Sequence, residues 1–276
     1  MKRWICILSI GIVSSVNGQY YFNDIVANAQ THQQYKLLRA ARVKKITGYS
    51  REAGLDTGGD VLFTQEVSMD GKRITLYSQE QNGKTSRTIT YYNMGKLVKS
   101  ESGNKNTQTT TQYTYHESGM PSRIQTTTRD TFLASTNTEI HEYFFKKDST
   151  PDFAYIIRNT IDTIQVYFTT NEQKQVLDET WKRKHKEIEK YYFYYDNKKQ
   201  LTDIVRFNSI ANKLLPDFVY TYNEAGNISE MMQVPRSGNN YVVWKYTYNE
   251  KGLKLTDNCF SKNKTLLGSL AYVYEY

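Results

Sequence analysis

The chain has 276 residues, which permits one large domain or two smaller ones, and it carries a formal net charge of +8. That basic balance favours anionic partners, such as an acidic glycan or a membrane surface. The 24 tyrosines and only 4 prolines favour strands, and the 2 cysteines exclude a fold that is held together by a network of disulfides.

The first residues have the pattern of a secretory signal. Lys2 and Arg3 precede an apolar run over residues 4–13, and Val16 and Gly18 stand at the positions that a signal peptidase reads. The run is too short to span a bilayer as a permanent helix. We therefore predict a signal peptide over residues 1–18 and export to the periplasm, the outer surface or the medium.

Residues 19–47 have the pattern of an N-terminal helical segment. No proline or glycine occurs from Tyr20 to Thr47, and Gly48 follows as a stop signal. Apolar residues recur every three to four positions, at Ile25, Ala29, Tyr35 and Leu38. Asn23 or Asp24 is the predicted N-cap, and the first strand is expected to begin as early as Val43.

Residues 48–276 alternate between β-rich runs and turn signals, which predicts an all-β domain. Asp70-Gly71 and Asn82-Gly83 indicate hairpins because both turn positions need positive φ, so residues 61–92 are expected to form a meander of about three strands. The segment 173–190 fits neither the helical nor the strand period well, and we interpret it as two strands. Residues 149–153 contain the plainest break and a possible sub-boundary of the sheet.

A repeat of 26 to 27 residues organises the second half of the chain. It is marked by a tyrosine directly before a turn, at Tyr195, Tyr222, Tyr248 and Tyr274. A second aromatic residue stands two positions earlier in each copy, at Phe193, Tyr220, Tyr246 and Tyr272. Residues two apart in a strand share a face, so the copies predict a structural ladder of aromatic side chains.

Each clear copy of the repeat then turns at an Asn or Asp and closes at a glycine. Asn223 with Gly226, and Asn249 with Gly252, are the predicted turn residues, because Asn bonds its own backbone and glycine adopts positive φ. Fainter copies occur over residues 90–97 and 113–120. About 26 residues suffice for two strands and two turns, which predicts an antiparallel β-meander, curled or spiralling or forming a partial barrel.

The segment YTYNEAGNI, Tyr220 to Ile228, resembles the tyrosine-aspartate (YD) repeat of Rhs-type and teneurin-type exported proteins, written Y-x-Y-D-x-x-G-x-L. This chain departs from that pattern at Lys199, which replaces glycine, and at Lys254, which replaces an apolar residue. In that family, many repeats build a β-shell that encloses a toxin or presents an extracellular binding surface. Too few copies are recognisable here to predict a closed shell, so the resemblance implies an exported β-repeat protein and not a toxin.

Catalytic and metal-binding motifs are weak in this sequence. Asp56-Thr57-Gly58 is the tripeptide of aspartic proteases, but it occurs once, and those enzymes need two facing carboxylates. The four histidines do not have the spacing of metal ligands, and no nucleophile elbow or phosphate-binding loop occurs. We predict no cofactor, no metal and no enzymatic activity, although a hydrolase that uses Asp196 or Glu224 is not distinguished by sequence. Cys259 is expected to be a half-buried apolar residue.

The segment 181–195 combines basic and aromatic residues more densely than any other. Its candidate binding residues are Lys182, Arg183, Lys184, Lys186, Tyr191, Tyr192 and Tyr194. Rings that stack on sugar faces beside ammonium groups suit an anionic glycan or another envelope component, whereas export argues against nucleic acid. The competing interpretation is a charged hairpin that leads into a covered strand.

Two functions follow from these patterns. The favoured one is a non-enzymatic exported scaffold or binding surface, with an anionic glycan as the expected ligand. The alternative is a periplasmic carrier of a lipid or lipoprotein, in which the N-terminal helix closes a half-barrel. Such a cavity favours Leu, Val and Phe, whereas Tyr and Thr dominate here. The oligomeric state is left open by the sequence.

Overall fold

The computed structural model describes residues 19–51, 59–79, 85–209, 211–235 and 240–276. The helix consists of a π-helical turn, Tyr21–Val26, followed by α1, Ala27–Ala40. The strands are β1 Lys45–Arg51, β2 Asp60–Val67, β3 Arg73–Gln79, β4 Thr85–Asn93, β5 Lys96–Gly103, β6 Thr107–Tyr115, β7 Pro121–Asp130, β8 Ser135–Phe145, β9 Pro151–Arg158, β10 Asp162–Thr170, β11 Val176–Arg183, β12 Lys186–Tyr195, β13 Leu201–Asn208, β14 Lys213–Tyr222, β15 Ile228–Gln233, β16 Val242–Tyr248, β17 Lys254–Ser261 and β18 Leu266–Glu275. The predicted signal peptide, Asp56-Thr57-Gly58 and Asn82-Gly83 lie outside the described residues.

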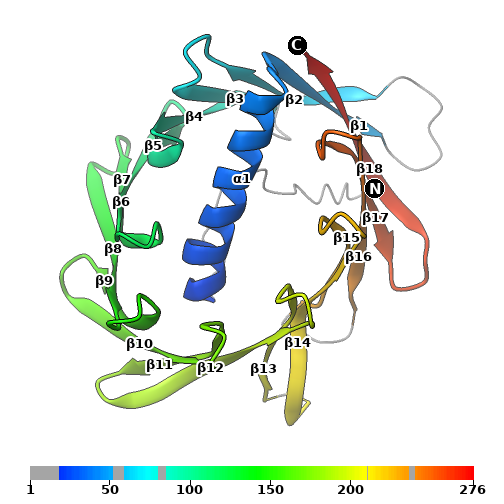
Figure 1. Ribbon diagram of the computed structural model, residues 1–276. Coiled ribbons are helices and arrows are strands. Elements are labelled where there is room, and N and C mark those ends of the chain that lie inside the picture. The colour runs from blue at the N-terminus through cyan, green and yellow to red at the C-terminus, as the bar shows by residue number, and fades with distance from the viewer. Residues whose placement is uncertain (1–18, 52–58, 80–84, 210, 236–239) are drawn as a thin grey trace.

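The strands form one closed antiparallel barrel around the helix (Figure 1). Each strand pairs with the next along the chain, and β1 pairs with both β2 and β18, which closes the ring. The predicted all-β fold with one N-terminal helix is therefore confirmed, as are the three strands over residues 61–92 and the two strands within 173–190. Residues 149 and 150 end the connection between β8 and β9, residues 151–153 begin β9, and the sheet continues from β8 to β9.

The expectation that the copies were too few for a closed shell is wrong, because some copies lack the marker residues. The connections Lys146–Thr150 and Asn171–Gln175 have the same backbone hydrogen bonds as Asn223–Asn227. Ser149 and Lys174 take the glycine position, with φ of 66° and 64°. Lys199, which departs from the YD pattern, does the same with φ of 65°. Non-glycine residues adopt this left-handed conformation at a cost of about 1–2 kcal/mol, so the backbone repeats where the sequence does not.

The tyrosine before each turn has a structural task. Tyr195, Tyr222, Tyr248 and Tyr274 donate their hydroxyls to the carbonyl oxygens of Val176 (2.8 Å), Leu201 (2.6 Å), Ile228 (2.8 Å) and Lys254 (2.7 Å). Each acceptor is the first residue of a strand in the preceding unit, namely of β11, β13, β15 or β17. The register also shifts at Tyr195, Tyr222 and Tyr248, as in a β-bulge. The hydroxyls of these four tyrosines therefore join each unit of the repeat to the preceding one by a hydrogen bond.

The inner face of the barrel holds the buried apolar core, whereas the outer face mixes charged, polar and exposed apolar side chains. Buried aromatic and aliphatic side chains of β8 to β14 pack around the start of the helix, and a second cluster from β1 to β5 and β18 packs around its end. Charged pairs lie on the outer face, such as Arg123 with Glu142 (3.2 Å) and Lys245 with Glu230 (3.2 Å). The core is thus inside the ring, and the outside of the wall is built for contact with water.

A carboxylate of the barrel wall caps the start of the helix. Glu179 of β11 accepts hydrogen bonds from the backbone nitrogens of Tyr20 (2.9 Å) and Tyr21 (2.7 Å) and from Trp181 Nε1 (3.1 Å). Glu179 is fully buried, and burial raises the pKa of its carboxyl to about 8. The predicted cap at Asn23 or Asp24 is wrong, because the free N–H groups of this helix are satisfied across the barrel rather than locally.

Asp24 instead fixes the helix to β8. Its Oδ2 accepts hydrogen bonds from His141 Nδ1 (2.6 Å) and from the hydroxyl of Tyr143 (2.6 Å). His141 also contacts Glu139 (2.8 Å), which pairs with Arg158 of β9. Burial alone lowers the pKa of His141, but the two carboxylates raise it to about 9.

In the described part of the chain, no helix is long and apolar enough to cross a membrane.

Candidate functional site

The outer face of β8, β9 and β10 carries a cluster of aromatic side chains. Phe144, Phe153 and Tyr167 lie opposite one another across the three strands. The rings of Phe144 and Phe153 stack with centroids 4.5 Å apart, and Tyr155 packs edge-on against both, at 5.6 and 5.4 Å. The Tyr167 ring lies 6.4 Å from Phe153. We call these four residues the aromatic cluster.

Basic residues of β11 and β12 extend this cluster along the wall. Lys182 Nζ lies over the Tyr167 ring, 5.0 Å from its centroid. On β12, Lys190 Nζ lies 5.1 Å from the Tyr192 centroid and 3.4 Å from Asp178. Tyr194, two residues further along the same face, is half exposed. Rings and ammonium groups therefore alternate over five neighbouring strands on one water-facing surface.

The predicted binding residues divide between three places. Lys182, Tyr192 and Tyr194 lie on this outer wall. Arg183, Lys184 and Lys186 lie at the β11–β12 connection, where Arg183 pairs with Asp162 at 3.0 Å. Tyr191 is buried inside the barrel beside Trp181, with ring centroids 5.4 Å apart. Its assignment to the binding surface is wrong, because successive strand residues point to opposite faces.

Sequence reasoning missed the aromatic cluster itself. Phe144, Phe153 and Tyr167 each alternate with an inward-facing residue, so period-two alternation within β8, β9 and β10 would have placed them on one face. The sequence does not reveal that these three strands are adjacent in a register that brings the rings together. The pairing of Phe144 with Phe153 across a turn was the available local signal.

The predicted ladder residues line the inside of the barrel. They are Phe193, Tyr195, Tyr220, Tyr222, Tyr246, Tyr248, Tyr272 and Tyr274. Burial raises the pKa of Tyr220, Tyr246 and Tyr272 well above the ordinary value. Phe193, Tyr220, Tyr246 and Tyr272 are buried core residues, whereas the tyrosines before the turns are half-buried, and Tyr222 lines an open hollow of about 420 Å³ beside Asp196 and Lys198.

The predicted turn residues have the backbone geometry of tight turns. Asn223 Oδ1 accepts a hydrogen bond from the Asn227 nitrogen (2.9 Å), and Asn249 Oδ1 accepts one from the Leu253 nitrogen (3.0 Å). Gly226 and Gly252 have φ of 81° and 75°. None of these groups is arranged as a catalytic pair with Glu224 or Asp196 in the contacts of the described residues.

Lys254 and Asp257 place a charged pair on the inner face of β17. Lys254 Nζ lies 3.2 Å from Asp257 Oδ2, which also accepts the Tyr272 hydroxyl at 2.8 Å. The same ammonium lies 4.0 Å from the centroid of the Tyr246 ring. This explains why a lysine is tolerated at the apolar position of the YD pattern: its head group is neutralised and covered by the ladder.

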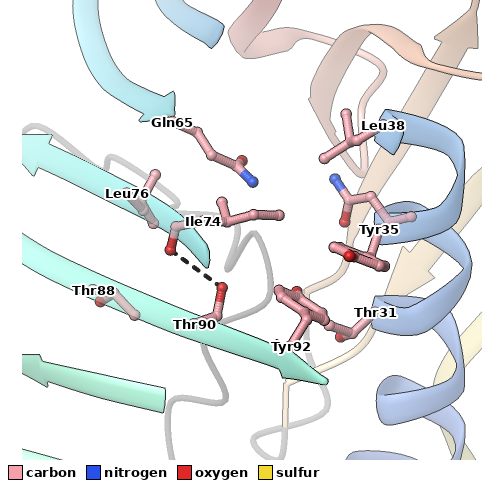
Figure 2. Close-up of a pocket in the computed structure, with 10 residues that line it drawn as sticks. Thr31, Tyr35, Leu38, Gln65, Ile74, Leu76, Thr88, Thr90 and Tyr92 are labelled. Atoms are coloured by element: carbon pink, nitrogen blue, oxygen red, sulfur yellow. Dashed lines mark hydrogen bonds between the residues drawn. The ribbon is translucent and has the colours of Figure 1, made fainter. Parts of the chain in front are cut away.

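A small cavity lies inside the barrel between the helix and β2 to β4 (Figure 2). Its volume is about 50 Å³, and its lining has no charged side chain. Tyr35 and Tyr92 stack at one side with centroids 4.0 Å apart, and the buried amide of Gln65 points into the cavity without a hydrogen-bond partner for its Oε1. Ligand pockets usually measure about 300–1,000 Å³, so this cavity suits ordered water that bonds Gln65.

A metal site is not formed by the residues that the structure describes. No group of three or more His, Cys, Asp or Glu side chains among them is placed to hold a metal ion. Cys259 is buried on the inner face of β17, opposite Trp244.

Comparisons with known proteins find distant likeness of shape. No family model and no curated protein matches the chain. Among solved structures, a porin-like protein from Bacteroides uniformis ATCC 8492 has a TM-score of 0.39 at 12% identity, covering 84% of this chain and 98% of that one. A porin-like protein from Bacteroides vulgatus ATCC 8482 has a TM-score of 0.33 at 13% identity, with the same coverage.

A toxin complex is also similar. The structure of TcdB2-TccC3-Cdc42 matches with a TM-score of 0.35 at 12% identity, covering 80% of this chain but only 13% of that one. This chain thus spans a small part of that toxin chain. TM-scores at this level do not support a functional assignment, and the YD-repeat resemblance stays a prediction.

Proposed function

We propose that the protein is an exported, non-enzymatic β-barrel that binds an anionic glycan on the outer wall of β8 to β12. The observation that carries this proposal is the aromatic cluster with Lys182 over the Tyr167 ring. Exposed rings offer flat apolar faces to the C–H groups of a sugar, while ammonium groups pair with carboxylate or sulfate substituents. The N-terminal signal pattern supports export.

Two further features support a binding role for this wall. The aromatic rings gain nothing from the barrel core, since they face away from it, and large exposed apolar patches commonly mark interaction sites. The cations are held in place by their neighbours, as Lys190 is by Asp178 and Tyr192. Positioned groups lose less side-chain entropy when a ligand binds.

The test is calorimetric titration of the chain from Gln19 to Tyr276 with polygalacturonate and chondroitin sulfate, with neutral dextran as the uncharged control. Phe153→Ala and Tyr167→Ala are expected to weaken binding about five- to tenfold each, since a lost ring contact of about 1 kcal/mol has that effect. Lys182→Ala should weaken binding of the acidic glycans while leaving weak dextran binding unchanged.

Matched controls lie on the far side of the barrel. Tyr77→Ala removes an outer-face tyrosine of β3 with 38% exposure, close to the 41% of Tyr167. Lys245→Ala removes an outer lysine that lies over the Phe260 ring. Equal losses in these controls, or no binding of either acidic glycan by the unaltered chain, would overturn the proposal.

The carrier alternative is less well supported. The sheet is a complete ring rather than a half-barrel, and the cavity beside the helix is about 50 Å³, far below the volume of ordinary ligand pockets. Organic extraction of the purified protein followed by mass spectrometry decides between the two functions. Stoichiometric acyl chains in the extract would support the carrier and count against a wall-bound glycan.

A further inference from the structure

The two ends of the barrel differ in what their connections expose. Successive connections alternate between the two ends of the barrel. One end carries the connections β2–β3, β4–β5 and so on to β16–β17, and we call it the turn rim. The other end carries the connections β1–β2, β3–β4 and so on to β17–β18, and we call it the loop rim. In Figure 1 the turn-rim connections curl inward over the lumen, whereas the β7–β8, β9–β10 and β11–β12 hairpins splay outward. The tips of two neighbouring loop-rim hairpins carry large apolar residues: Phe132 and Leu133 at β7–β8, and Ile161 at β9–β10.

These apolar tips are held out into solvent by well-ordered turns. Phe132 is 83% exposed, Leu133 68% and Ile161 89%. Asp130 Oδ1 accepts hydrogen bonds from the backbone nitrogens of Phe132 and Leu133, both at 2.9 Å. Aspartate bonds of this kind fix a turn, so the exposure of the two side chains is built into the backbone.

Each tip is hydrogen-bonded to a neighbouring part of the barrel. Thr131 donates from its backbone nitrogen and its hydroxyl to the Asn106 carbonyl, at 2.8 and 2.9 Å. Asn159 accepts from the Thr138 nitrogen (2.8 Å) and donates to Asn137 (3.1 Å), which joins the β9–β10 connection to β8. Adjacent hairpins lie about 10 Å apart, at two strand spacings. The two tips are thus neighbours on one rim, each fixed to an adjacent element.

Cations surround the apolar tips. The exposed basic residues of this part of the loop rim are Lys105, Arg129, Arg183, Lys184, Lys186 and Lys213. Three acids lie among them: Asp130 accepts from its own turn, Asp162 pairs with Arg183 at 3.0 Å, and Glu187 is exposed beside Lys186, so the basic residues remain in excess. The described surface thus combines separated apolar points with an excess of positive charge.

The backbone of the β11–β12 tip is strained. Lys184 and His185 are the two central residues of the hairpin connection, with φ of 49° and 65°. A two-residue connection with both φ values positive favours Asn-Gly, so Lys-His is an unfavourable choice for the fold. Positive φ at non-glycine residues also occurs in other connections of this chain, such as Asn159 and Lys199, so what this tip adds to the rim is its exposed basic residues.

We propose that the described part of the loop rim that carries the β7–β8 and β9–β10 tips docks on the surface of a bilayer that contains anionic phospholipid. Phe132, Leu133 and Ile161 enter the headgroup region, and the surrounding lysines and arginines pair with phosphates. A bilayer fits better than a folded partner, because the apolar residues stand on separate tips without a groove between them. A fluid headgroup layer accepts such points individually, and anionic lipid adds electrostatic attraction. This inference does not depend on glycan binding at the wall.

The wall itself stays outside the bilayer. Charged pairs such as Arg123 with Glu142 lie along the outer face of the strands, and burying them in hydrocarbon would be costly. Contact is therefore limited to the tips, which places the aromatic cluster above the membrane surface and accessible to a glycan.

The test is co-sedimentation of the chain from Gln19 to Tyr276 with vesicles of phosphatidylcholine alone or of equal parts phosphatidylcholine and phosphatidylglycerol. Binding is expected to the mixed vesicles only, and to weaken as salt screens the charges. The combined variant F132S/L133S/I161S should bind the mixed vesicles about tenfold more weakly or worse. All three side chains are exposed, so thermal unfolding should be unchanged and exclude misfolding as the cause.

Matched controls come from the turn rim, where Met69 and Met94 are fully exposed apolar tips. M69S/M94S should bind the mixed vesicles as the unaltered chain does. A tryptophan reporter at Phe132 should shift its emission to the blue on the mixed vesicles, and one at Met69 should not. Equal binding to phosphatidylcholine alone, equal loss in M69S/M94S, or self-association that F132S/L133S/I161S abolishes in the absence of vesicles would each overturn the proposal.

Discussion

At the turn rim, connections such as Asn223–Asn227 and Asn249–Leu253 share one backbone: an Asn or Asp that bonds across the turn and a residue with positive φ. Among the described loop-rim connections, those from β5–β6 to β11–β12 differ in length and expose apolar or basic residues instead. The sequence repeat therefore determines the backbone of the turn rim and not that of the loop rim. The turn rim and its tyrosines specify how one unit joins the next, so the opposite end can vary without disturbing the barrel.

The largest expected contrast is between a ladder tyrosine and a loop-rim tip. Tyr220 is buried and lies near Phe218 and Phe22, with ring centroids 6.1 and 6.0 Å apart. Tyr220→Ala should lower the free energy of unfolding by about 3–5 kcal/mol, because it leaves a cavity in the core. Phe132→Ala should change it by less than about 0.5 kcal/mol. Urea unfolding followed by circular dichroism gives both values. Similar losses of stability in the two variants would contradict the distinction between a core ladder and an exposed loop-rim tip.

Alkaline pH should lower the free energy of unfolding through the groups that hold the start of the helix, Glu179 and His141, and not through either rim. The pKa of Glu179 is raised to about 8 in the fold, so the folded state holds a proton that the unfolded chain releases above its ordinary pKa of 4.5. Its contribution is present below pH 4.5 and is lost as pH rises toward 8, at about 1.4 kcal/mol per pH unit. His141, raised to about 9, acts in the same direction between pH 6.5 and 9.

Glu179→Gln removes the titration and keeps one acceptor oxygen, for Tyr20 and Trp181 Nε1, while it loses the oxygen that accepts from the Tyr21 nitrogen. Urea unfolding measured across this pH range should show a flatter decline for Glu179→Gln than for the unaltered chain. A stability that rises from pH 5 to pH 8 in the unaltered chain would contradict the anchor.

Backbone conformation should matter in opposite directions within the turn rim. Gly226 has φ of 81°, and Gly226→Ala should destabilise the fold by about 1–2 kcal/mol. Lys199 occupies the equivalent position with φ of 65°, and Lys199→Gly should stabilise the fold by about 1 kcal/mol. Denaturant midpoints of the two variants test the equivalence. A loss of stability in Lys199→Gly would show that the lysine serves a contact that the repeat does not explain.

The same backbone change at the loop rim should separate stability from binding. Lys184 has φ of 49°, so Lys184→Gly is expected to stabilise the fold by about 1 kcal/mol or slightly less. It also removes a charge from the docking surface, and binding to phosphatidylglycerol vesicles should weaken. Thermal unfolding and co-sedimentation on one protein sample give both numbers. Unchanged vesicle binding would remove Lys184 from the docking surface.

The smallest effect concerns one hydroxyl. Tyr248 donates to the Ile228 carbonyl at 2.8 Å, and Tyr248→Phe should cost about 0.5–1.5 kcal/mol. Tyr167 on the outer wall donates only to the neighbouring Gln165 side chain at 3.1 Å. Tyr167→Phe should therefore leave the free energy of unfolding unchanged, as unfolding in urea will show.

Much of the local structure was predictable because it depends on residues that are close in sequence. The strand pairs around Asp70-Gly71, the two strands within residues 173–190 and the placement of Tyr220 and Tyr222 on one face of the sheet follow from alternation and turn chemistry, whereas that this face is the inside of a barrel does not. The copies at Ser149 and Lys174 escaped notice, since side chains other than glycine adopt the left-handed conformation there.

Closure and anchoring depend on long-range contacts that no local pattern encodes. Barrel closure pairs Lys45 with Glu275, and the helix start bonds to Glu179, which lies far along the chain. The binding surface was predicted in part: Lys182 and Tyr192 share the outer wall, but Tyr191 does not. Its alternation with Tyr192 was visible, whereas the adjacency of Phe144, Phe153 and Tyr167 required the register of the sheet.

Hydrogen–deuterium exchange on the chain from Gln19 to Tyr276, with and without phosphatidylglycerol-containing vesicles, tests the division between the two rims most directly. Added protection is predicted at the loop-rim connections over residues 131–134, 159–161 and 184–185, with none at Asn223–Asn227 or Asn249–Leu253. Protection that is equal at both rims, or confined to the turn rim, would contradict the account.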